Sequence, residues 1–219
     1  MKAILIGSIG ALTETSEIQR QCFNQALAEA GTGLHWNVAS YCELIKSPGG
    51  FNRLTSLGIN ASLATTIHER KQALFAEKIQ GQITPRDGML DLIDECARQN
   101  IKIGLVTTTT KTTVEAIMSA LSDKIDFSHF SVVSHAGNVT HAKPASDIYI
   151  YALSRLGVSA HEVMAIEDTI ANVKAAENAG IACLFTPGDY AAVPVSSMGA
   201  APAYEASYQT CLSHFQKAA

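Results

Sequence analysis

The sequence has little charge, no long apolar run and no cluster of basic residues. Charged residues make up 16% of the 219 residues and hydrophobic residues 47%, a composition that excludes intrinsic disorder. The apolar runs are only as long as strands and are often interrupted, so no membrane span is predicted. The formal net charge is −4, and no stripe of Lys and Arg marks a nucleic-acid-binding surface. We therefore expect neither a membrane nor a nucleic acid as a partner.

The cysteines are too few and too scattered for a disulfide framework. There are five, an odd number, and their spacing fits no zinc knuckle: Cys22, Cys42, Cys96, Cys183 and Cys211. We expect them to be buried thiols in a reducing compartment. The short apolar run at the amino terminus has no A-x-A-like cleavage site after it, so we predict a first β-strand there and a cytoplasmic protein.

The sequence does contain a regular alternation of short β-like runs and helical patterns. The β-like runs occupy residues 101–106, 130–134, 162–166 and 181–185, and the helical patterns lie at 88–99, 112–121, 145–156 and 169–179. This alternation predicts an α/β fold, with a parallel sheet covered by helices on both faces. After an irregular stretch over 187–202, we expect a last helix near 204–216.

Residues 15–83 interrupt the alternation, because only helical patterns follow the first strand in this segment. Phe23, Leu27 and Ala30 share a helix face, and Gly- and Pro-containing breakers at 31–33, 47–50 and 81–85 divide and close the segment. We therefore predict a helical cap of residues 15–83, inserted after the first strand of a core formed by residues 1–14 and 84–219. Trp36 and Tyr41 are expected in the core of this cap.

Three polar features follow strand-like runs, and in a parallel sheet they would converge at the carboxyl edge of the strands. Thr107 is the first residue after the run 101–106 and lies beside the start of a predicted helix, where anions are favoured. Lys143 is a cation placed just before a helix by Pro144. The adjacent carboxylates Glu167 and Asp168 suit a hard cation such as Mg²⁺. Taken singly, the threonine and the acids could be helix caps, and the lysine a solvated loop residue.

Taken in order and at this spacing, the three features resemble the haloacid dehalogenase (HAD) superfamily of phosphatases. The family's motifs II, III and IV are a Thr or Ser after a strand, a Lys before a helix, and acidic residues after a strand. The likeness extends over nearly the whole chain and includes the segments FNQALAEAG, KPASDIYIYALSRLGV and IEDTIANVKAAENAG. Within the superfamily the chain is most similar to the CbbY-like and β-phosphoglucomutase-like branch, which acts on sugar phosphates and has a small helical cap.

The resemblance implies a HAD-like Rossmannoid core and a set of site residues. Thr107, Thr108 and Lys143 would grip a phosphoryl group, and Glu167 and Asp168 would hold Mg²⁺. In the cap, Arg53 follows a Gly-rich segment that resembles the one whose basic residues contact the distal phosphate of the family's substrates. The seven histidines show no metal-ligand spacing, and we assign none of them a catalytic role.

The chain departs from the family in motif I, which reads D-x-D-G-T in active members. Here Gly7 stands at the position of the nucleophile and Ile9 at that of the general acid/base. Ser8 is a weak substitute, because side chains alternate along a strand and Ser8 is then expected to face away from the phosphate. An unactivated serine is also a poor nucleophile. Whether the chain is an enzyme is therefore left open by the sequence, and we predict an inactive one.

The two missing aspartates also change the predicted charge of the pocket. Lys143, Glu167 and Asp168 sum to about −1, so a Lys143–Asp168 ion pair becomes possible and Mg²⁺ is less required and less well held. Our first hypothesis is a pseudophosphatase that still binds a phosphorylated small molecule. The alternatives are a weakly active, Mg²⁺-dependent sugar-phosphate phosphatase, and a non-catalytic interaction module in which Ile9 fills the old pocket.

Overall fold

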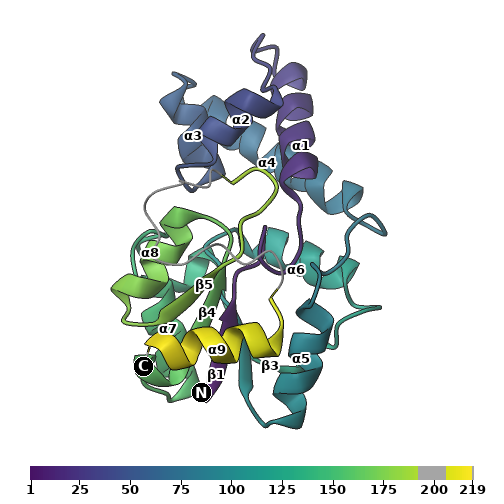
Figure 1. The fold of residues 1–219 in the computed structure, drawn as a ribbon. Coiled ribbons are helices and arrows are strands. Elements are labelled where there is room, and N and C mark those ends of the chain that lie inside the picture. Colours follow the sequence, from purple (N-terminus) through teal and green to yellow (C-terminus); the bar gives the residue numbers. More distant parts are fainter. Residues whose placement is uncertain (192–205, 219) are drawn as a thin grey trace.

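The computed structural model describes residues 1–191 and 206–218, and its centre is a five-stranded parallel sheet (Figure 1). The strands lie in the order β3-β2-β1-β4-β5. Their bounds are β1 (Ala3–Ile6), β2 (Lys102–Leu105), β3 (Phe130–Val133), β4 (Val163–Glu167) and β5 (Ala182–Phe185). In the central strand, Ala3 lies opposite Lys102 on one side and Val163 on the other. The predicted α/β class and the central place of the first strand are confirmed.

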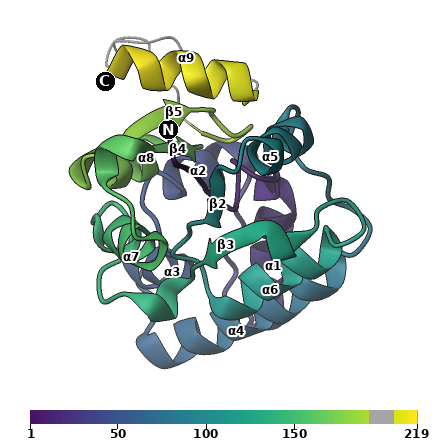
Figure 2. The ribbon, with the colours of Figure 1, turned by 90° about the horizontal axis from the view of Figure 1, so that it is seen from below.

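Helices cover both faces of the sheet, as predicted (Figure 2). The side chains of α5 (Met89–Arg98), α6 (Lys111–Ala120) and α9 (Tyr208–Ala218) share one apolar cluster with Ile4 and Ile6 of β1. Those of α7 (Asp147–Leu156) and α8 (Ile170–Asn178) share the other with Ala3 and Leu5. Alternate residues of β1 thus point to opposite faces, and every residue of this strand is buried. Three short 3₁₀ helices lie at Phe127–His129, Ala136–Asn138 and Ala160–Glu162.

The spacing of apolar residues explains why these segments are helices. In α5 the buried residues are Met89, Leu92, Ile93 and Cys96, which recur at the i, i+3, i+4 and i+7 positions of one helix face. Side-chain caps fix several starts: the Thr110 hydroxyl accepts from Thr113 N at 3.3 Å at the beginning of α6. Apart from the last helix, the observed bounds lie within about two residues of those expected from the sequence.

Four helices lie between β1 and α5 in the chain, above the carboxyl edge of the sheet (Figure 1). They are α1 (Ser16–Glu29), α2 (Val38–Leu44), α3 (Gly50–Ser56) and α4 (Ala61–Lys78). α1 packs along α4, and Phe23, Leu27 and Phe75 are buried in their apolar cluster. Trp36 and Tyr41 are also buried there, as expected, with their rings stacked 6.1 Å apart.

The carboxyl-terminal and cysteine predictions meet the structure only in part. The last helix begins at Tyr208 and ends at Ala218. Of the irregular stretch expected over 187–202, residues 187–191 form neither helix nor strand, and the rest lies outside the described residues. All five cysteines are unpaired, but Cys42 is only half-buried, because its place on the short α2 leaves one side open. Over residues 1–191 and 206–218, no helix combines the length and the apolar character that a membrane crossing needs.

Candidate functional site

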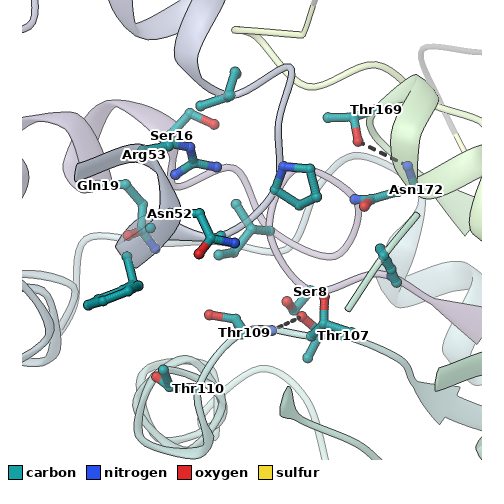
Figure 3. Close-up of a pocket in the computed structure, with 18 of the residues that line it drawn as sticks. Ser8, Ser16, Gln19, Asn52, Arg53, Thr107, Thr109, Thr110, Thr169 and Asn172 are labelled. Atoms are coloured by element: carbon teal, nitrogen blue, oxygen red, sulfur yellow. Dashed lines mark hydrogen bonds between the residues drawn. The ribbon is translucent and has the colours of Figure 1, made fainter. Parts of the chain in front are cut away.

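A cavity of about 280 Å³ lies between the carboxyl edge of the sheet and the helices α1 to α4 (Figure 3). One wall is built by residues that end or follow β1, β2, β3 and β4, and the other by residues of the segment that holds the helices α1 to α4, which we call the cap. Figure 3 shows Ser8, Thr107 and Thr109 on the first wall and Gln19 and Arg53 on the second. All the site residues predicted from the sequence line this cavity, with the exception of Gly7. They are Ile9, Arg53, Thr107, Thr108, Lys143, Glu167 and Asp168.

The loop after β1 corrects the prediction that Ser8 faces away from the site. Both Ser8 and Ile9 line the cavity. The alternation of side chains applies only within a strand, and β1 ends at Ile6. Beyond it the chain turns, with Leu12 N donating to Gly7 O at 3.0 Å and Thr13 N to Ser8 O at 3.2 Å. Ile9 contributes to the cavity wall but does not fill the space.

The threonines after β2 offer uncharged hydrogen-bonding groups. The Thr107 hydroxyl accepts from Thr109 N at 3.2 Å, and Thr107 N donates to Ser134 Oγ at 3.2 Å. A hydroxyl that accepts one bond still has its own proton to donate, so Thr107 can donate into the cavity. Thr110 is the residue that caps α6, so the capping function weighed for Thr107 belongs to Thr110. Thr107 and Thr108 are thereby left beside the helix start, facing the cavity.

Lys143 is buried and pairs with Glu167, which corrects the predicted pair with Asp168. Its ammonium donates to Glu167 Oε1 and also to Val106 O at 2.9 Å, and it lies 5.1 Å from the centre of the Tyr149 ring. The Tyr149 hydroxyl donates to the same Glu167 oxygen. Glu167 is the last residue of β4 and Asp168 follows it, but only Glu167 pairs with Lys143. The lysine charge is therefore balanced by a carboxylate before any ligand binds.

Glu167 also occupies the space left by the missing side chain of residue 7. A Cβ atom built on Gly7 would lie 2.5 Å from Glu167 Oε2 and 3.0 Å from its carboxyl carbon. This second oxygen is buried and has no hydrogen-bond partner among the described residues. The carboxylate of Glu167 therefore lies where a side chain of residue 7 would be.

Asp168 is the remaining acid of the site. Its Oδ1 accepts from Asn172 Nδ2 at 2.9 Å. Burial, with Glu167 as the second cause, raises the pKa of Asp168 from 3.8 to about 7. The alternative interpretation, that Glu167 or Asp168 caps α8, is wrong. The N-cap of α8 is Thr169, whose hydroxyl accepts from Asn172 N at 3.4 Å.

The donors at this edge fit Mg²⁺ poorly. Mg²⁺ favours six oxygen ligands in octahedral geometry, usually with one or two carboxylates free to bind it. Here one Glu167 oxygen accepts hydrogen bonds from Lys143 and Tyr149, and the other faces Gly7. Asp168 is then the one carboxylate of this pair that is available to a metal ion. In the part of the chain that the structure describes, no three His, Cys, Asp or Glu residues gather in a group that could hold a metal ion.

The cap wall of the cavity carries two basic side chains, Arg53 and Lys71. Of these, the sequence analysis predicted only Arg53. Arg53 Nε donates to Leu44 O at 3.1 Å, and within residues 1–191 and 206–218 its guanidinium forms no salt bridge. Lys71 is buried beside it in the same wall, between the rings of Phe23 and Phe75 at 5.0 Å each. It donates to Gln19 Oε1, and burial lowers its pKa from 10.5 to about 7.

His68 and Gln19 complete this wall, and neither was singled out from the sequence. Burial, followed by the charges of Lys71 and Arg53, lowers the pKa of His68 to about 4. A signal for Lys71 did exist: it lies on the apolar face of α4, with Ile67 four residues before it and Leu74 three residues after it. A lysine in an apolar stripe is rare unless it serves a ligand or a partner.

Comparisons with known proteins agree with this geometry. The sequence model of the haloacid dehalogenase-like hydrolase family matches residues 10–186. The protein CbbY of Cereibacter sphaeroides is 34% identical over 197 residues, which cover 87% of this chain and 86% of that protein. The protein CbbY of Rhodobacter capsulatus is 32% identical over 197 residues, with 87% of each chain covered.

Solved structures give the same result. The crystal structure of CbbY from Rhodobacter sphaeroides in complex with phosphate has a TM-score of 0.88 and 29% identity, and the match covers 99% of both chains. A mutant of that protein in complex with xylulose-1,5-bisphosphate has a TM-score of 0.83 and 31% identity, covering 91% of this chain and 92% of the other. The chain therefore belongs to the haloacid dehalogenase-like hydrolase family, in its CbbY-like branch.

Proposed function

We propose that this protein is a pseudophosphatase that binds a sugar carrying two phosphate groups and hydrolyses it at no more than a trace rate. The observation that supports the proposal is the presence of hydrogen-bond donors at one end of the cavity and of basic side chains at the other. At the core end, Thr107, Thr108 and Lys143 present donors. At the cap end, Arg53 is a cation and Lys71 becomes one when it is protonated, and neither has a salt-bridge partner in the described residues.

The charge at the two ends supports a ligand with two anionic groups. The core end sums to about −1 from Lys143, Glu167 and Asp168, so an anion there relies on hydroxyl and backbone donors. The cap end has an excess of positive charge, which supplies the stronger attraction. A bound xylulose bisphosphate in a relative of 31% identity fits this arrangement. A cavity of about 280 Å³ lies near the lower end of the ~300–1,000 Å³ typical of small-molecule sites.

The absence of efficient catalysis follows from the residues at motif I. Phosphoryl transfer in this family passes through an aspartyl-phosphate, which Gly7 cannot form. Removing an activated nucleophile typically lowers the rate by about 10⁴- to 10⁶-fold. Glu167 is no ready replacement, because one of its oxygens is held by Lys143 and Tyr149 and the other is buried against Gly7.

As part of the same proposal, residues 1–14 and 84–219 form the core that carries the phosphate-binding groups, and residues 15–83 form the cap. Thr107, Thr108 and Lys143 would bind one phosphate and Arg53 the other. Glu167 and Asp168 would hold Mg²⁺ only weakly.

Calorimetry with three ligands tests the proposal: xylulose-1,5-bisphosphate, a ketose monophosphate and inorganic phosphate. We expect the bisphosphate to bind at least ten-fold more tightly than either of the others. Arg53→Gln should remove most of that advantage and leave phosphate binding unchanged. Arg70→Gln is the matched control, because Arg70 lies on the exposed side of α4 and pairs with Glu29. Equal affinity for all three ligands would refute a two-ended site.

A second candidate, a weakly active phosphatase, is favoured by one observation. Thr107, Lys143, Glu167 and Asp168 all line the same cavity, although buried polar groups that serve no ligand are destabilising. Phosphate release from the bisphosphate, measured with added Mg²⁺, separates the two functions. If the wild-type protein releases phosphate at a robust rate and Asp168→Ala abolishes this release, the protein is a phosphatase and the pseudophosphatase proposal is wrong.

A further inference from the structure

The segment that follows β5 connects the acidic end of β4 to the helical cap. We call residues 186–190 the strap. At its core end, Thr186 N donates to Glu167 O at 2.8 Å, and Gly188 N to Asp168 O at 3.4 Å. Arg86 donates to the Thr186 carbonyl at 2.9 Å. The start of the strap is therefore fixed to the backbone of the two residues that line the core end of the cavity.

The other end of the strap reaches the cap. Asp189 N donates to Glu14 Oε2 at 2.8 Å, and the other Glu14 carboxylate oxygen accepts from Ser16 N at 2.7 Å, where α1 begins. The Tyr190 hydroxyl donates to Glu17 on the first turn of α1. Its ring meets the Tyr41 ring edge-on, with 6.0 Å between the centres.

At its middle, the strap packs closely against the segment that connects β1 to α1. A Cβ atom built on Gly188 would lie 2.7 Å from Glu14 Oε2 and 3.4 Å from the Gly10 Cα atom. The strap thus passes directly over the connection between β1 and the cap. Any rotation of the cap about that connection would pull Glu14 and Glu17 away from the strap.

Tyr190 is also the first ring of a chain of aromatic contacts that leads to the cavity. Tyr41 stacks on Trp36, and the Trp36 ring lies 4.7 Å from that of Phe23. Tyr41 and Phe23 both line the cavity. A continuous run of aromatic contacts therefore joins Tyr190 to the wall that holds Arg53 and Lys71.

We propose that the strap is a clasp that holds the cap closed over the cavity, with Tyr190 as its positioning residue. Tyr190 is not among the residues that line the cavity. It acts by holding α1 and Tyr41 at a fixed place relative to Glu167 and Asp168. On the other side of the cavity, Gln72 Nε2 donates to Thr110 Oγ1 at 2.7 Å, so the cap is also tied to the start of α6. Opening of the cap therefore requires the release of the contacts that Tyr190 makes.

The clasp can be tested without any ligand, because Trp36 is the chain's single tryptophan and belongs to the aromatic chain. The variants are Tyr190→Ala, Tyr190→Phe, which removes only the hydroxyl, and the control Tyr151→Phe on α7. We expect the acrylamide quenching constant of Trp36 to rise at least two-fold in Tyr190→Ala, with a smaller rise in Tyr190→Phe. Amide exchange over residues 13–19 should accelerate in the same order, and the control should match wild type in both measurements.

Unchanged quenching and exchange in Tyr190→Ala would overturn the clasp. If Tyr190→Ala fails to fold, as judged by circular dichroism, the same criterion applies to Tyr190→Phe. A ligand measurement keeps the clasp separate from the proposed function: the dissociation rate of xylulose-1,5-bisphosphate should increase several-fold in Tyr190→Phe. If no protein binds the bisphosphate while Trp36 still responds to Tyr190, the clasp stands and the proposed function fails.

Discussion

Gly7→Ala adds a single methyl group at a crowded point of the site, and we expect it to destabilise the protein. The new Cβ would lie 2.5 Å from Glu167 Oε2, whereas ordinary contacts begin at 3.4 Å, so the carboxylate must retreat by about 0.9 Å. That movement distorts the hydrogen bonds that Glu167 accepts from Lys143 and Tyr149. Hydrogen bonds to charged groups contribute about 1.5–3 kcal/mol each, so we expect a loss of about 2–3 kcal/mol.

Urea denaturation followed by circular dichroism measures this loss as a change in the free energy of unfolding. For a protein of this size, about 2–3 kcal/mol corresponds to a fall of about 4–12 °C in the melting temperature. At a glycine with unstrained backbone and free space, the same substitution normally stabilises by about 0.4–1 kcal/mol. The sign of the effect therefore distinguishes a crowded position 7 from an open one.

The matched background combines Glu167→Ala with Lys143→Met, which removes the obstructing carboxylate without leaving a buried lysine unpaired. In that background Gly7→Ala should be neutral or slightly stabilising. The difference between the two backgrounds is the coupling between position 7 and Glu167. An equal effect in both, or no effect in wild type, would refute the idea that Glu167 has taken the place of the missing side chain.

Three further predictions concern metal, charge and catalysis. Mg²⁺ should bind with a Kd of about 1 mM or weaker, since Asp168 is the main free carboxylate, and micromolar binding in calorimetry would show that this ligand set is wrong. Lys71→Met should be more stable than wild type by about 2–4 kcal/mol at pH 6–7. The upper limit of this gain is the pKa shift of Lys71 multiplied by about 1.4 kcal/mol per pKa unit. Burial lowers the pKa of Lys71 from 10.5 to about 7, so the unfolded chain binds more protons between those values and wild-type stability rises with pH. The advantage of the variant should therefore disappear by about pH 10.5 in urea titrations; a constant advantage would mean that Lys71 is not desolvated. Gly7→Asp with Ile9→Asp should release more phosphate from a sugar phosphate than wild type, while either change alone should not. A folded but inactive double variant would favour the interaction module.

The sheet and its helices could be predicted from the sequence because each element buries one face and so imposes its own period on the chain. The run at 130–134 is β3, for example, and the helical pattern at 169–179 is α8. The convergence of Thr107, Lys143 and Asp168 on one cavity likewise follows from the topology, because loops after parallel strands share an edge.

Details that depend on where a strand stops or on which rotamer a side chain adopts could not be predicted in this way. Ser8 was misplaced because the last residue of β1 is not marked in the sequence. The partner of Lys143 was misplaced because neighbouring acids at a strand end point in different directions. Lys71 and Gln19 were missed because they are distant in the sequence, and their contact exists only once α1 and α4 have packed.

The position of β1 in the middle of the sheet also affects how the chain reaches its fold. Ala3 pairs with Lys102 and with Val163, which are 99 and 160 residues further along the chain. On the ribosome, the first strand emerges long before either neighbour, while the four helices after it can form from local contacts. A fragment that ends before β4 would leave one edge of β1 unpaired, and such an apolar edge favours aggregation. The helices that close over the cavity in the finished protein are therefore the first part of the chain able to fold, and the sheet beneath them is completed last.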